Sequence, residues 1–167
     1  MKLTLKHGLL LLAGLLGVIA FMLMFAPPLA LLLGNVEPET FNMEFTNVYF
    51  GKAYDGVEMN GAGGAFVGYL FILLGSVYTA TTAFVNVKHD KYISLGVALL
   101  MLIGSILVLC TRSMWISANK NIVSGEIIKV CAAPIVAGIF GILSCFAGLF
   151  SKLMVGEDDK IKKISIN

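Results

Sequence analysis

The sequence predicts an all-α membrane protein, a bundle of four transmembrane helices with a small extracytoplasmic β-hairpin between the first two. Of the 167 residues, 58% are hydrophobic and 13% are charged, a balance that a small soluble domain could not carry without aggregating. Asp, Glu, Lys and Arg are also missing from four long stretches, 7–36, 59–87, 92–111 and 130–151. Because a helix needs about 20 apolar residues to cross about 30 Å of hydrocarbon, each stretch can hold one span.

The first predicted helix covers about residues 8–33. Two lysines precede it, which is also how a signal peptide begins. The apolar part of a signal peptide is about 7 to 15 residues long, whereas this run continues from Gly8 past Ala26. We therefore expect a retained helix, bent or ended locally by Pro27 and Pro28.

Residues 35–63 form the predicted outer loop, the one segment with room for folded structure outside the spans. Apolar and polar residues alternate in it, which is the pattern of a half-buried strand. The apolar members are Phe41, Met43 and Phe45, followed by Val48, Tyr49 and Phe50. A tight turn at Asp55-Gly56 then precedes a second short alternation at 57–59, so we expect a small β-hairpin over the helix ends.

This loop is acidic and aromatic, and two roles are open for it. It is either a contact surface for a partner protein or a lid over the bundle. The side chains that a partner would contact are Phe41, Phe45, Tyr49 and Tyr54.

The other helices are predicted at about residues 64–86, 93–111 and 128–151. A short turn at 88–91 joins the second to the third. The last segment, 152–167, reads as a polar tail. The whole chain is thus predicted to be a single four-helix transmembrane domain.

The lysines indicate the orientation. Eight of the 12 basic residues lie near one end of the predicted bundle, and positive-inside counting places that end in the cytoplasm. The eight are Lys2, Lys6, Lys88, Lys91, Lys152, Lys160, Lys162 and Lys163. We expect a multi-pass protein of the cell membrane with both termini cytoplasmic.

Small residues gather on one face of the second and fourth helices, and helices in lipid associate by close packing of such residues. The predicted helix-packing residues are Gly64, Gly68, Gly75, Thr79 and Thr82 on the second helix and Ala133, Ala137, Gly141 and Gly148 on the fourth. A weaker stripe marks the first helix, and we identify none on the third. These faces either pack inside one bundle or join copies of the chain.

Two cysteines, Cys110 and Cys131, lie equally far from the middle of the last outer loop. They would lie at similar depth in an antiparallel helix pair, near an oxidising surface. They could form a disulfide or remain as small packing residues.

The spans lack, in their middle parts, the charged residues and histidines that proton pumps, ion-coupled transporters and intramembrane enzymes use. No Asp, Glu, Lys, Arg or His lies in the middle of a span, which argues against a proton pump or an ion-coupled transporter. The histidines, His7 and His89, lie at the cytoplasmic edge, so no catalytic site is predicted. We predict no cofactor, no metal and no nucleic-acid partner; the expected partners are membrane lipids and a second protein or copy.

Four helices with an outer β-element after the first resemble the plan of the claudin and peripheral-myelin tetraspan proteins. The outer loop of those proteins carries a tryptophan, a Gly-Leu-Trp motif and a cysteine pair, whereas residues 35–63 contain neither Trp nor Cys. The resemblance is one of architecture and implies no function.

Two functions rank ahead of an enzyme for this sequence. The first is a structural or accessory subunit that acts through contacts within the membrane and at the outer loop. The alternative is an oligomeric pore or channel for an uncharged or small solute, with a polar lining from one stripe of the second helix. That stripe contains Ser76, Thr79, Thr82 and Asn86.

Overall fold

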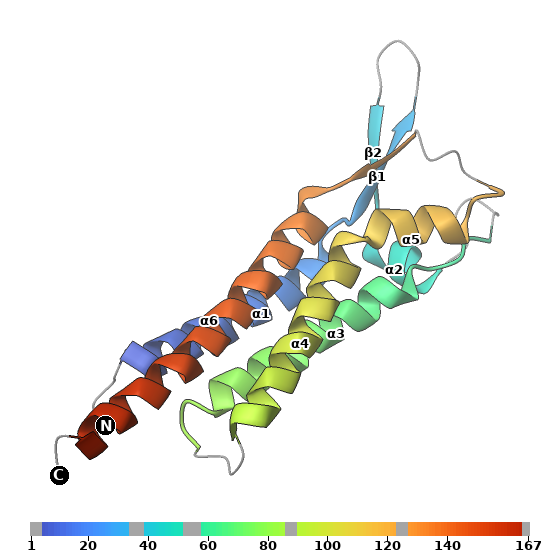
Figure 1. Ribbon diagram of the computed structural model, residues 1–167. Coiled ribbons are helices and arrows are strands. Elements are labelled where there is room, and N and C mark those ends of the chain that lie inside the picture. The colour runs from blue at the N-terminus through green and yellow to red at the C-terminus, as the bar shows by residue number, and fades with distance from the viewer. Residues whose placement is uncertain (1–4, 34–38, 52–57, 86–89, 123–126, 165–167) are drawn as a thin grey trace.

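A computed structural model describes residues 5–33, 39–51, 58–85, 90–122 and 127–164, and the chain is mostly helical there. Four of its helices are long and apolar enough to cross a membrane, as predicted. They are α1 (Leu5–Met22), α3 (Gly63–Thr81), α4 (Asp90–Leu109) and α6 (Ala132–Ile164). They run side by side, and α1 begins and α6 ends at the same end of the bundle (Figure 1).

The four helices form a ring. α1 packs against α3 and α6, and α4 packs against the same two helices. α3 and α6 therefore face each other across the bundle and touch only where small residues let them approach. This order around the ring decides which predicted faces meet.

The first helix is shorter than predicted. α1 ends at Met22, a 3-10 turn η1 (Leu23–Phe25) follows, and the apolar run Leu29–Leu33 is a strand, β1. Ala26 is extended, with φ −79° and ψ 156°. The reason is the proline pair at 27–28, because a proline disfavours helical backbone in the residue before it and donates no hydrogen bond of its own.

The predicted hairpin exists with a different partner strand. β2 (Glu39–Met43) pairs with β1, and β1 also pairs with β3 (Ile128–Val130), giving an antiparallel sheet in the order β2-β1-β3. The prediction of a strand at 57–59 is wrong for Glu58 and Met59, which have no strand structure. The predicted turn at 55–56 lies outside the described residues.

The register explains the alternation in β2. Leu29 stands between Met43 and Val130, whereas the next row contains Ala30 between Asn42 and Lys129. Leu29 and Met43 are buried, and Asn42 and Lys129 are exposed. One sheet face therefore packs on the end of the bundle and the other faces outward, as the period of two predicts.

Two short helices were not predicted. Phe45–Phe50 is helix α2 rather than a continuing strand, and it ends at Gly51, whose φ of +68° is the left-handed conformation common after helices. Helix α5 (Thr111–Ala118) follows α4 after a break at Cys110. Together with the three strands these helices form what we call the cap, at one end of the bundle (Figure 1).

Both ends of the fourth predicted helix differ from the structure. Residues 128–130 form β3, and α6 begins at Ala132. At the other end α6 continues through the polar segment to Ile164 instead of stopping near 151. Extending a helix that already exists needs no new nucleation, so a polar segment without proline can continue it.

Candidate functional site in the helix-packing centre and the cap

The centre of the bundle is built from small residues of three helices. Gly17 of α1 lies so close to α3 that a Cβ there would collide with the Ser76 hydroxyl, and it would come within 3.3 Å of Ser144 Oγ on α6. Close backbone approach of this kind is how helices associate when lipid removes the hydrophobic driving force between them.

Three fully buried serines lie in this centre, one each on α3, α4 and α6. Their hydroxyls donate to backbone carbonyls, which satisfies polar groups that would otherwise be costly to bury. The pairs are Ser76 with Ile72 O (2.5 Å), Ser105 with Met101 O (2.8 Å) and Ser144 with Ala13 O (2.5 Å). The bond from Ser144 joins α6 to α1.

α3 and α4 touch backbone to backbone. A Cβ on Gly68 would lie 2.6 Å from the Gly104 carbonyl oxygen, and a Cβ on Gly104 would lie 2.6 Å from the Gly68 carbonyl oxygen. Gly68 was predicted as a packing residue, but the prediction that the third helix has no close-approach face is wrong. The Gly104-Ser105 pair was the signal in the sequence.

α6 approaches both α4 and α3. A Cβ on Gly141 would collide with Ser105 Oγ and come within 2.9 Å of Ile72 Cδ1, whereas one on Gly148 would lie 3.2 Å from Thr79 Cγ2. Gly141 therefore lies where three helices meet.

The other predicted packing residues are placed as follows. Ala133, Ala137, Gly75, Thr79 and Thr82 are buried, and Gly75 faces Met101 of α4. Gly64 is exposed and faces Met114 of α5 rather than a long helix. These faces are thus used within one chain.

The polar stripe of α3 lines packed interior. Thr79 Oγ1 donates to Gly75 O (2.8 Å) and Thr82 Oγ1 to Thr79 O (2.8 Å). The cavity beside them, which Ser94 and Lys152 also line, has a volume of about 10 Å³, room for about one water molecule. Asn86, the fourth predicted lining residue, lies outside the described residues.

An aromatic cluster joins the cap to the bundle. Tyr49 of α2 donates its hydroxyl to that of Tyr69 on α3 (3.4 Å), and the rings meet edge to face at 5.7 Å. Burial raises the pKa of Tyr49, which keeps it a neutral donor. Trp115 of α5 is fully buried beside them, and its indole Nε1 has no hydrogen-bond partner within the described parts of the chain.

Asn119 forms hydrogen bonds with the loop that leads into α3, and we call this contact the Asn119 clasp. Its Oδ1 accepts from the Asn60 backbone N–H (2.8 Å), and its Nδ2 donates to the carbonyls of Asn60 (2.8 Å) and Trp115 (2.9 Å). The same loop lies against α2, because a Cβ on Gly61 would come within 2.5 Å of the Tyr49 carbonyl oxygen. Arg112 Nε adds a bond to Ile128 O in β3 (2.9 Å).

Of the four predicted partner-contact residues, the structure describes the side chains of two, and these two are not exposed together on a surface. Tyr49 is a buried core residue, and Phe45 is half-buried against Phe25. Tyr54 and the side chain of Phe41 lie outside the described residues. The sequence predicts a strand that continues through Phe45 and Tyr49, whereas the structure has helix α2 there, and both side chains turn toward neighbouring helices rather than outward.

Cys110 and Cys131, for which a disulfide and two small packing residues were both open, are free thiols in the structure. The Cys131 thiol donates toward Asn42 Oδ1 at 3.9 Å, and burial raises its pKa. Among the described residues, no three His, Cys, Asp or Glu side chains are placed to hold a metal ion.

No protein-family model matches this chain, and a search of curated proteins finds no matching relative.

Proposed function

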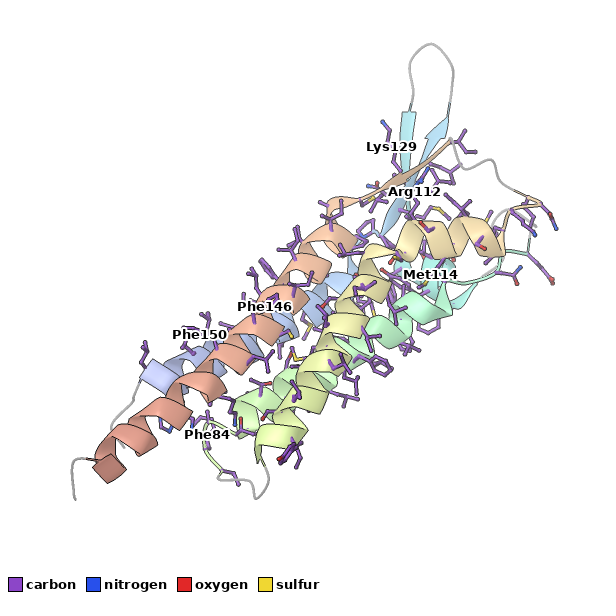
Figure 2. All side chains as sticks on the ribbon, viewed as in Figure 1. Phe84, Arg112, Met114, Lys129, Phe146 and Phe150 are labelled. Carbon is purple, nitrogen blue, oxygen red and sulfur yellow. The ribbon has the colours of Figure 1, made fainter. Side chains whose placement is uncertain are left out.

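We propose that the protein crosses a membrane four times, with α1, α3, α4 and α6 as the spans and both termini in the cytoplasm. The observation that carries this proposal is the reversed polarity of the bundle. Its centre contains serines and glycines, whereas its outward positions are Leu, Ile and Phe. Phe146 and Phe150 of α6, for example, point away from the other helices (Figure 2). Such a surface is stable in lipid and would aggregate in water.

We further propose that the protein is a structural or accessory subunit whose cap contacts another protein. The cap is held to the bundle by the Asn119 clasp, the bond from Arg112 to Ile128 and the aromatic cluster. These contacts give the cap a fixed shape, and a preformed surface loses little entropy on binding. Lys129 of the sheet and Ile122 beyond α5 are exposed at its outer side.

The alternative remains an oligomeric pore. The α3 stripe does not support it directly, because Ser76, Thr79 and Thr82 are buried and donate to carbonyls of their own helix. A pore would have to form between copies of the chain, on faces that are now apolar.

Photo-crosslinking in native membranes tests the accessory role. A photoreactive residue at Lys129 or Ile122 should give one discrete adduct with a second protein, and one at the outward position Leu99 of α4 should not. Solute flux through liposomes that contain the purified protein, with no adduct from the cap, would favour the pore.

Release of the chain from membranes by an alkaline wash without detergent would contradict the membrane proposal itself.

A further inference from the structure

α2 lies across the ends of α1 and α3 that are nearest the cap, and its aromatic rings contact η1, which follows α1, and α3. The Phe45 ring meets that of Phe25 in η1 at 5.3 Å, edge to face, and the Phe50 ring meets that of Phe66 in the first turn of α3 at 4.8 Å. Phe25 is the last residue of the first apolar helical stretch, and Phe66 lies near the start of the next. The two ring pairs therefore mark the same end of two neighbouring helices.

The exposed residue of α2 is aromatic, whereas its polar residues Thr46 and Asn47 are half-buried and buried. The inner side of this helix, Val48 and Tyr49, is buried in the cap. On its outer side, Phe50 is 55% exposed, and Phe25 of η1, the ring partner of Phe45, is 52% exposed. A folded cap surrounded only by water would gain nothing from presenting these rings on one side.

α5, the other short helix of the cap, has a different surface. It exposes the hydroxyl residues Ser113 and Ser117, and Trp115 between them is fully buried. Among the described residues of the two short helices, the exposed aromatic ring thus belongs to α2, although both helices lie at the same end of the bundle (Figure 1).

We infer that α2 lies in the interfacial layer of the bilayer, with Phe25 and Phe50 inserted between lipid chains just below the headgroups. This inference rests on the proposed membrane crossing. Its occupant is lipid because exposed apolar residues of the spans stand close to the rings along the chain: Met22, one turn before Phe25, and Val67, directly after Phe66, are exposed as well. Short helices with aromatic and aliphatic residues on one side bind membranes in this way.

Fluorescence quenching in liposomes tests the inference. The chain has one tryptophan, Trp115, which is buried and therefore shielded from the quenchers, and its emission, measured in wild type, is subtracted. We would compare wild type with Phe50→Trp, Phe25→Trp, Ser117→Trp and Leu143→Trp, the last at an outward position in the middle of α6. The quenchers are lipids brominated near the headgroup, lipids brominated near the chain end, and iodide in the water.

The inference expects Phe50→Trp and Phe25→Trp to be quenched most by shallow bromine and little by iodide. Ser117→Trp should show the reverse and Leu143→Trp should respond to deep bromine. Iodide quenching of Phe50→Trp equal to that of Ser117→Trp would overturn the inference, and so would shielding of both Phe variants from every quencher, because a second copy would then cover the rings. A Leu143→Trp variant that no brominated lipid quenches would instead overturn the proposed membrane crossing.

Discussion

The Asn119 side chain binds the backbone of Asn60 as a neighbouring strand would, with one hydrogen bond accepted and one donated. Its amide group has a donor and an acceptor at nearly the spacing of a peptide group, so it can bind the Asn60 backbone at both positions. The two residues are 59 positions apart, and a single asparagine in a loop carries no pattern that would reveal such a pairing from the sequence.

Asn119→Ala should therefore loosen the cap. The change removes the partner of the Asn60 N–H and carbonyl, and because Asn60 is itself exposed to water, we expect a loss of about 0.5–1.5 kcal/mol in the free energy of unfolding. Thermal unfolding in mild detergent measures the loss, and hydrogen exchange at residues 58–62 should speed up. The control is Asn121→Ala at an exposed position nearby; equal stability of the two variants would contradict the clasp.

At the scale of elements, a helix contact tolerates an added Cβ only if the atom that the Cβ would meet can move away. A Cβ on Gly68 would meet the backbone of α4, which cannot rotate away as a side chain can. Gly96, also a helical glycine of an apolar span, has no atom within 4 Å of the position where a Cβ would stand.

Gly68→Ala and Gly96→Ala are consequently a matched pair with opposite expected signs. Gly68→Ala should force α3 from α4 and lower the free energy of unfolding by about 1–3 kcal/mol. Gly96→Ala should raise it by about 0.5–1 kcal/mol, because alanine loses less backbone entropy in a helix. Unfolding of both variants in the same detergent measures the difference, and equal shifts would show that α3 and α4 do not approach at Gly68.

Gly141→Leu tests whether the α6 face packs within the chain. The new side chain would overlap Ser105 and Ile72, so we expect a lower melting temperature, or lost yield, without a change in native mass. Leu143→Ile, on the outward face, should change neither property. A smaller native mass with an intact fold would show that this face joins separate chains instead.

The long helices were predictable because their signal is local. A gap of about 20 residues without charge is visible in any window of the sequence, and all four gaps contain a long apolar helix. The glycine stripes of α3 and α6 were visible for the same reason. β1 was not, since Leu29–Leu33 is as apolar as the helix before it, and its strand structure depends on pairing with distant segments. Periodicity in short apolar runs cannot separate the two structures.

For the whole molecule, the lysine distribution predicts which end lies in the cytoplasm. A cysteine at Asn121, exposed near the cap, should react with an impermeant reagent added to intact cells, and one at Ser165 should not. The native thiols, Cys110, Cys131 and Cys145, provide the background to subtract. Labelling of Ser165 in sealed cells, or of Asn121 only after lysis, would overturn the orientation.

The central position of β1 has a consequence for biosynthesis. A ribosome delivers β1 and β2 early, but β3 emerges only after α4 and α5, and α6 follows last. Until then one edge of β1 has no partner strand, and the carbonyl of Ala13 lacks the hydrogen bond that the Ser144 hydroxyl donates to it. Nascent chains with open strand edges are prone to misassembly. The first helix is thus made first but gains its last contacts from the segments made last, so a chain interrupted before Ile128 would lack both β3 and the bond from Ser144.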